Sequence, residues 1–137
     1  MRFMMLVKAS KESEAGALPS KELLAAMGQF NEEMVKAGVM IAGDGLQPSS
    51  KGTRVTFSGA KRTFTDGPFA ETRELLAGFW MIDVKSKADA LAWAARVPFS
   101  DGEVIEVRQV FEAEDFPPEE VAREERLRDE LQRRAKR

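Results

Sequence analysis

The densest group of side chains that could do chemistry lies in residues 65–74. Asp66 precedes a Gly67-Pro68 turn, and Glu71 and Arg73 follow it. A carboxylate held at a strand end beside a cleft can act as a general acid or base when burial moves its pKa toward neutrality. Asp66 is therefore the candidate catalytic residue, and it joins Glu71 and Arg73 as a candidate ligand-binding residue. The structural alternative is that Asp66 only accepts hydrogen bonds from the amides of its own turn.

Two further positions complete the candidate ligand-binding set, Asp44 and Trp80. Asp44 lies in a Gly-Asp-Gly turn that matches neither phosphate-loop pattern. Trp80 lies in an expected strand and is the better pocket candidate, whereas Trp93 lies in an expected helix, where an aromatic ring usually packs. The carboxylates around Asp66 lack the Asp-x-Asp-x-Asp spacing of a calcium loop. We therefore expect no metal site and no cofactor.

Composition restricts the available chemistry. The 137 residues include no cysteine and no histidine, which excludes disulfides, thiol nucleophiles, Cys-based zinc sites and histidine bases. Basic and acidic residues are interleaved at a net charge of -2, so we expect no nucleic-acid surface. No apolar run approaches the ~18 residues of a membrane helix, and no signal-peptide pattern opens the chain. These features predict a cytoplasmic protein that does not bind membranes.

Apolar spacing and turn residues predict the elements that must position these side chains. Leu23, Met27, Phe30 and Met34 mark one face of a helix over residues 21–37, between a Ser20 cap and Gly38. A second helix runs from residue 86 to Pro98, with Ala88, Leu91, Ala92 and Ala95 as its expected apolar face. Extended segments are expected at residues 2–7, 39–42, 53–57, 62–65, 79–84 and 104–111, the third and fourth forming a hairpin.

The order strand, helix, strand, hairpin, strand, helix, strand fits a ferredoxin-like α+β sandwich with both helices on one sheet face. The strands carry more apolar residues than one helical layer can cover: Phe3, Met5, Val7, Phe79, Met81 and Phe111. We therefore expect a second subunit to cover the other sheet face. A homodimer is the simplest closed assembly.

The composition changes after this α+β domain, which we place at residues 1–112, and a charged helical extension follows at residues 113–137. Four oppositely charged pairs have the i, i+4 spacing that stabilises a helix by ~0.2–0.5 kcal/mol each: Glu119–Arg123, Glu124–Arg128, Asp129–Arg133 and Glu130–Arg134. Only Val121, Leu127 and Leu131 form an apolar edge. The extension is thus either a solvated helix or an arm that packs on a partner subunit.

Three segments of the chain resemble the DGPF branch of the YCII-related domain family. They are Asp66 to Glu74, with the sequence DGPFAETRE, and the AGDGL and ALAWAARVP segments that begin at Ala42 and Ala90. The resemblance runs from Met1 to about Val110. It implies a dimeric α+β barrel of two facing ferredoxin-like sheets. YCII-type proteins are thought to use a His and Asp pair, but this chain has no histidine, and Val97 stands before Pro98 where the family has its aspartate.

Three functional hypotheses follow. The first is a homodimer that binds a small organic molecule in the cleft between its sheets. The second is a lyase- or isomerase-like enzyme with Asp66 as its acid or base. The third is an accessory or regulatory protein with a docking tail, because the resemblance implies a link to extracytoplasmic-function sigma factors.

Overall fold

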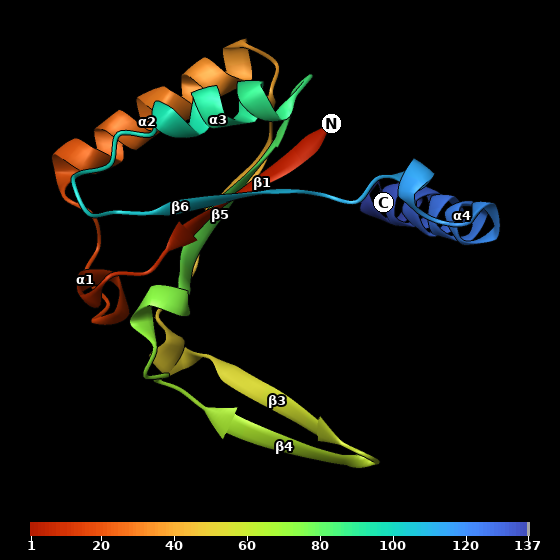
Figure 1. Cartoon of the computed structure of the whole chain (residues 1–137), viewed down its shortest axis with the longest axis horizontal. Coiled ribbons are helices and arrows are strands. Elements are labelled where there is room, and N and C mark those ends of the chain that lie inside the picture. The colour runs from red at the N-terminus through yellow and green to blue at the C-terminus, as the bar shows by residue number, and fades with distance from the viewer. Residues whose placement is uncertain (137) are drawn as a thin grey trace.

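A four-stranded antiparallel sheet with the strand order β2-β5-β1-β6 forms the centre of the structure, a computed structural model (Figure 1). The structure describes residues 1–136, apart from the side chain of Arg73. The sheet strands are β1 (Arg2–Lys8), β2 (Met40–Gly45), β5 (Leu76–Asp83) and β6 (Ile105–Gln109). Helices α2 (Lys21–Lys36) and α3 (Lys87–Ala95) cover one face of the sheet. This mixed α+β arrangement is consistent with the predicted ferredoxin-like sandwich.

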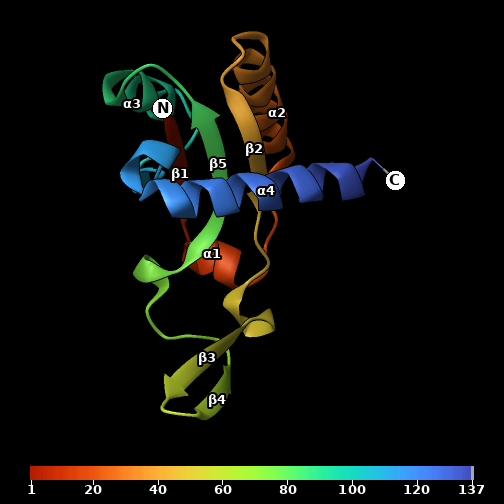
Figure 2. The same cartoon turned by 90° about the vertical axis from the view of Figure 1, so that its right-hand side faces the viewer.

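Two other elements project from the sheet on the side away from α2 and α3 (Figures 1 and 2). One is the predicted hairpin, formed by β3 (Thr53–Ser58) and β4 (Lys61–Asp66). The other is α4 (Pro118–Ala135), which confirms the predicted C-terminal helix. A short helix, α1 (Lys11–Glu14), follows β1. None of the helices within residues 1–136 combines the length and apolar character needed to cross a membrane.

The first long helix forms where its sequence predicts. The Leu23 N–H donates to Ser20 Oγ at 3.1 Å and caps the amino end of α2. Gly38, with a φ of 73°, follows the carboxyl end in the left-handed region that favours glycine. Phe30 and Met34 from the predicted apolar face are buried against the sheet.

The core lies between this helical layer and the sheet. β1 contributes Phe3 and Met5, and β5 contributes Trp80 and Ile82, all of them buried. The rings of Phe30 and Trp80 meet edge to face, with centroids 5.6 Å apart. Alternation along each strand therefore sends these side chains toward the helices, which accounts for part of the apolar excess noted in the strands.

The predicted apolar face of α3 is wrong. Ala90 is buried, and Trp93 and Ala94 pack on the core, whereas Leu91 is 47% exposed. An alanine-rich helix offers two overlapping faces with i, i+3 and i+4 spacing. The face that carries the large ring of Trp93 buries more apolar area and is the one that packs.

The last strand is shorter than predicted. β6 ends at Gln109, so Phe111 lies outside the sheet, where its ring contacts Phe116 at a centroid distance of 5.4 Å. Ile105 and Val107 do face the core, as expected from the strand alternation.

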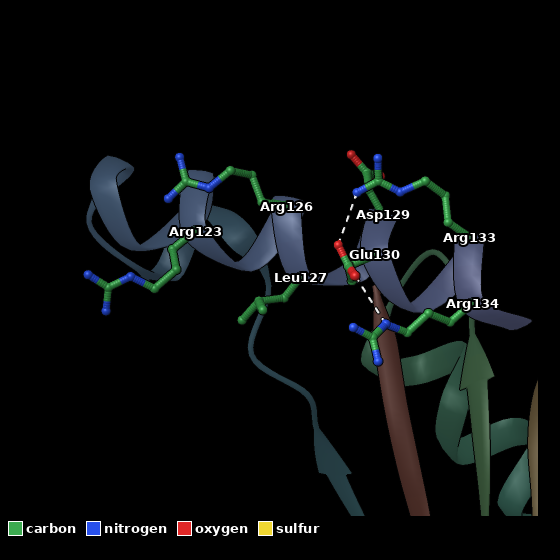
Figure 3. Close-up of a pocket in the computed structure, with 7 residues that line it drawn as sticks. All are labelled: Arg123, Arg126, Leu127, Asp129, Glu130, Arg133 and Arg134. Carbon is green, nitrogen blue, oxygen red and sulfur yellow. Dashed lines mark hydrogen bonds and ion pairs between the residues drawn. The ribbon is translucent and has the colours of Figure 1, made fainter.

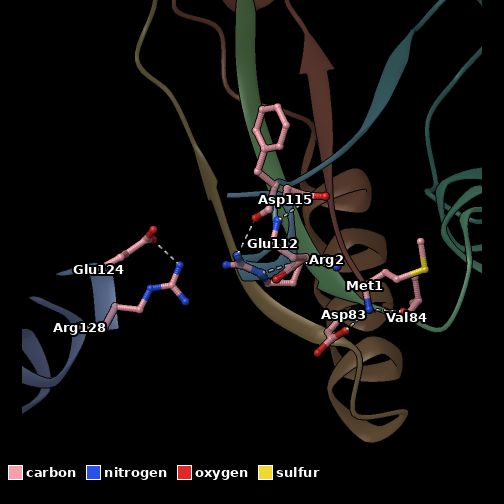
Figure 4. A network of polar contacts seen from close by, with 9 residues as sticks. Met1, Arg2, Asp83, Val84, Glu112, Asp115, Glu124 and Arg128 are labelled. Atoms are coloured by element: carbon pink, nitrogen blue, oxygen red, sulfur yellow. Dashed lines mark hydrogen bonds and ion pairs between the residues drawn. The ribbon is translucent and has the colours of Figure 1, made fainter. Parts of the chain in front are cut away.

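A polar anchor fixes the chain between β6 and α4 (Figure 4). The backbone N–H and Nε of Arg2 donate to Glu112 Oε1 at 3.3 Å and 3.0 Å. Arg2 Nη2 also donates to the carbonyl oxygen of Phe111, and the Glu112 N–H donates to Asp115 Oδ2 at 2.7 Å. The hydrogen bond from Arg2 lowers the pKa of Glu112 below its ordinary value of 4.5.

This anchor predicts an acid-sensitive contribution to stability. A carboxyl with a lowered folded-state pKa stabilises the fold above its unfolded pKa, and the stabilisation is lost as the pH falls through the lowered value. Glu112→Gln is therefore expected to reduce the loss of stability on acidification below pH 4.5. Urea unfolding at about pH 7 and about pH 3 measures this loss. Glu114→Gln, at an exposed neighbouring position, is the control; equal losses in wild type and Glu112→Gln would contradict the prediction.

The ion pairs of α4 only partly follow the predicted spacing, and Figure 3 shows the two that Glu130 makes with Arg133 and Arg134. Glu124–Arg128 and Glu130–Arg134 form, at 2.7 Å and 3.0 Å. Arg123 pairs instead with Glu120, and Arg133 pairs with Glu130, both with i, i+3 spacing. Residues three and four positions apart are both neighbours on a helix surface, so the long arginine side chains can reach either partner.

Candidate functional site

The Gly67-Pro68 turn is built into a network of backbone contacts at the root of the hairpin. The Gly67 N–H donates to the Gly52 carbonyl oxygen at 3.0 Å, and the Phe69 N–H donates to Ser49 Oγ at 3.1 Å. The Ser49 N–H in turn donates to Glu14 Oε2 at 2.8 Å, which ties the turn to α1. The peptide bond before Pro68 is cis. This turn ends β4 at Asp66.

Asp66 is exposed at the end of β4, directly opposite Thr53 of β3. Its Oδ1 accepts a hydrogen bond from the Thr53 hydroxyl at 2.8 Å. This hydrogen bond gives Asp66 a structural role in closing the open end of the hairpin. Its partner is the Thr53 hydroxyl and not the amides of the turn, as the structural alternative had it. Its proposed catalytic role stays a prediction.

The other predicted site residues lie in different parts of the structure. Glu71 is exposed beside the turn. The predicted turn at Asp44 is wrong, because β2 continues to Gly45 through its pairing with β5, and Asp44 is exposed opposite Phe79. Trp80 is only 4% exposed and donates its indole N–H to Asn31 Oδ1 at 2.8 Å. Its place in the core therefore accounts for a tryptophan at this position without a ligand. The Arg73 side chain lies outside the described part of the structure. Within that part, no group of three or more acidic side chains is placed to hold a metal ion.

Gly67 is required where it stands because a side chain has no room there. A Cβ built at this position would lie 1.8 Å from the carbonyl oxygen of Ser49. Gly67→Ala is therefore expected to displace the turn and to cost about 1–3 kcal/mol of unfolding free energy, as in other overpacked sites. Chemical denaturation measures this cost.

Gly28→Ala is the matched control for Gly67→Ala. A Cβ at Gly28 would meet nothing within 4 Å, and the residue lies inside α2. Alanine is the better helix former by ~0.8–1.0 kcal/mol, so this variant should be unchanged or more stable. Equal stability of Gly67→Ala and wild type would show that the turn accommodates a side chain.

The sheet face opposite the helices has a different character from the hairpin root. Met4 of β1 pairs in register with Met81 of β5, and Leu6 pairs with Phe79, so these side chains share one face. Ala42 of β2 lies opposite Met81 and extends the same apolar surface. We call these five residues the open face, because they are half-buried and neither α2 nor α3 covers them.

Charged side chains border the open face. On the β6 side, Lys8 Nζ lies 3.3 Å from Glu106 Oε1, and Arg108 Nη1 lies 3.4 Å from Glu106 Oε2. The hydrogen bond and charge of Lys8 lower the pKa of Glu106 below 4.5. Asp44 lies at the β2 side. An apolar centre between polar borders can hold the body of an organic molecule and orient its polar group.

Sequence reasoning missed this border, although part of its signal was present. Alternation along the last strand sends Glu106 and Arg108 away from the core side, and alternation along β1 sends Lys8 to the same face. What joins them is the pairing of β1 with β6, strands separated by about a hundred residues in the chain. The positions of the strands along the sequence do not reveal which strands lie side by side in the sheet.

Comparisons with known proteins agree with this architecture. The model of the YCII-related domain matches residues 1–114, a region that contains the sheet, both covering helices and the hairpin and ends before α4. An uncharacterised protein of Rhizobium meliloti (strain 1021), R00369, is 38% identical over 60 residues. Those residues are 44% of this chain and 48% of the relative, so the match spans about half of each. The chain belongs to the YCII-related domain family.

Proposed function

We propose that this protein is a cytoplasmic homodimer of the DGPF branch whose two open faces pack against each other and enclose a small organic molecule. The open face is the observation that carries the proposal. Met4, Leu6, Phe79 and Met81 form a contiguous apolar surface at the centre of the sheet, and within residues 1–136 no layer of the same chain covers it. Contiguous exposed apolar surface is typical of protein or ligand contacts.

A second copy is the occupant that best fits this surface. A two-fold axis brings the same surface of each chain together, so Leu6 and Phe79 of one protomer meet an equally apolar partner. Facing sheets pack about 10 Å apart, a distance filled by side chains of this size. The DGPFAETRE sequence at residues 66–74 supports placement in the DGPF branch, for which a dimeric α+β barrel is expected.

The borders indicate the chemistry of the ligand. Lys8 and Arg108 lie at one side of the apolar centre, and their charges are only partly balanced by Glu106. A small organic acid with an apolar body would place its acid group there and its body over Leu6 and Phe79.

A library of aromatic and aliphatic carboxylic acids tests this function. Binding should raise the melting temperature in a saturable manner, following RT ln(1 + [L]/Kd). Backbone amide shifts in NMR spectra should change for the strands that carry Leu6 and Phe79 and not for the outer surface of α3. Saturable binding that maps to α3, or no binding across the library, would contradict the proposal.

Proton transfer by Asp66 is the second candidate. Its carboxylate is exposed and bonds to Thr53 through one oxygen, which leaves the group accessible to a substrate. Turnover that disappears in Asp66→Asn, with the fold intact, would establish this role. The regulatory hypothesis, a link to extracytoplasmic-function sigma factors, rests on the family resemblance alone.

A further inference from the structure

Helix α4 lies apart from the rest of its own chain. In the described residues it forms no extended contact with another element and has no buried residue. Leu127 and Leu131 on its apolar edge are 59% and 67% exposed. Figure 2 shows the helix crossing in front of the sheet, on the side of the open face. Helices in globular proteins draw most of their stability from packing an apolar face, and this helix lacks such packing within one protomer.

The segment that leads into α4 is nevertheless anchored to the sheet. Arg2 donates a hydrogen bond to the Glu112 side chain, and the Glu112 backbone N–H donates one to Asp115 (Figure 4). The rings of Phe111 and Phe116 pack together just before the helix begins. The anchor connects β1, at the centre of the sheet, to the segment that leads into α4. The helix is therefore an arm that starts from an anchored segment beside the sheet.

The hairpin is a second arm with an exposed apolar face, on which the Arg62 guanidinium stacks over the Phe57 ring at 4.5 Å. Val55 lies opposite Phe64 in the register of β3 and β4, and Phe57 is two residues from Val55, so all three share one face. Phe57 and Phe64 are 68% and 70% exposed. An isolated two-stranded hairpin is marginally stable in water, and these residues give it a surface to pack on another element.

The hairpin and the first half of α4 carry opposite charges. The hairpin and the turn before it, residues 51–66, contain four basic residues and one acidic residue: Lys51, Arg54, Lys61, Arg62 and Asp66. The first half of α4, residues 118–125, contains four acidic residues and one basic residue: Glu119, Glu120, Glu124, Glu125 and Arg123. Complementary charge of this kind guides association and fixes orientation between surfaces.

We propose that α4 of each protomer packs on the β3–β4 hairpin of its partner, a contact that rests on the homodimer proposed above. Both arms project on the side of the open face (Figure 1). The proposed homodimer places the second copy on that side. The apolar edge of the helix covers Phe57 and Phe64, and its acidic half meets the basic hairpin. Two-fold symmetry makes this contact twice, so every arm is covered.

Cysteine cross-linking tests the contact, because the chain has no cysteine of its own. The Val55→Cys, Leu127→Cys double variant, treated with a short bismaleimide, should give a covalent dimer on a denaturing gel. The control is the Thr56→Cys, Leu127→Cys double variant. Thr56 follows Val55 in β3, so its side chain lies on the opposite face of the hairpin. This control should give at least tenfold less covalent dimer.

Each outcome decides the inference. A covalent dimer that depends on Val55→Cys supports it. A cross-link within one chain, or none in a protein that sediments as a dimer, overturns the arm contact and leaves the homodimer standing. A protein that sediments as a monomer overturns both proposals.

Charge reversal gives a second, independent readout. Lys61→Glu with Arg62→Glu should weaken the dimer at least tenfold, and Glu119→Lys with Glu120→Lys should do the same. All four changes together should restore most of the affinity, because the opposite charges then face each other again. Purely additive losses in the combined variant would overturn the arm contact.

Discussion

Phe79→Glu is expected to convert the proposed homodimer into a folded monomer. Phe79 lies at the centre of the open face, opposite Leu6 on β1 and Asp44 on β2. In the proposed dimer the new carboxylate would be buried in an apolar interface and close to the like-charged Asp44, at a cost of several kcal/mol. We expect the dissociation constant to rise at least about 100-fold, since each 1.4 kcal/mol is a factor of ten.

The monomer should keep its fold because the same glutamate is hydrated when the partner leaves. Sedimentation velocity measures the assembly, and circular dichroism measures the fold. Leu91→Glu, at a half-exposed position on α3 away from the open face, is the control and should stay dimeric. A dimer of unchanged affinity in Phe79→Glu would remove the open face from the interface.

Phe3→Ala is expected to have the largest effect on the fold itself. Phe3 is 1% exposed and packs in the core beneath α2 and α3. Truncating a buried phenylalanine costs about 3–5 kcal/mol through lost burial and the cavity left behind. Since small domains have only about 5–15 kcal/mol of stability, the variant should be close to unfolding.

Urea unfolding of Phe3→Ala and of Val35→Ala measures this difference. Val35 is an exposed residue of α2, so its truncation should change stability by less than about 0.5 kcal/mol. A loss below about 1 kcal/mol in Phe3→Ala would contradict the core described here. Comparison with Phe79→Glu separates the two sheet faces: the covered face should determine folding, and the open face should determine assembly of the proposed homodimer.

Local signals predicted much of the fold. The Ser20 cap, the apolar residues spaced three or four positions apart and Gly38 predict the end of α2 to within one residue. The hairpin follows from alternation around a glycine turn. The face of α3 and the end of β6 were wrong because both depend on packing: Trp93 selects the buried helix face, and Phe111 leaves the sheet to contact Phe116.

The candidate site was less accessible to sequence reasoning. The Gly67-Pro68 turn was recognised, but its support by Ser49 and Glu14 comes from distant segments. Trp80 was assigned to a pocket, whereas the register of β5 sends it to the core and sends its neighbour Phe79 to the open face. A shift of one residue in a strand changes the face, and only the pairing of strands determines which residue points where.

The mass of the unmodified chain in solution tests the central claim most directly. Sedimentation equilibrium over a wide range of concentrations should give twice the mass of the 137-residue chain, with dissociation only on strong dilution. A mass of one chain at every concentration would show that the open face needs no partner, and it would contradict both the homodimer and the site between its sheets.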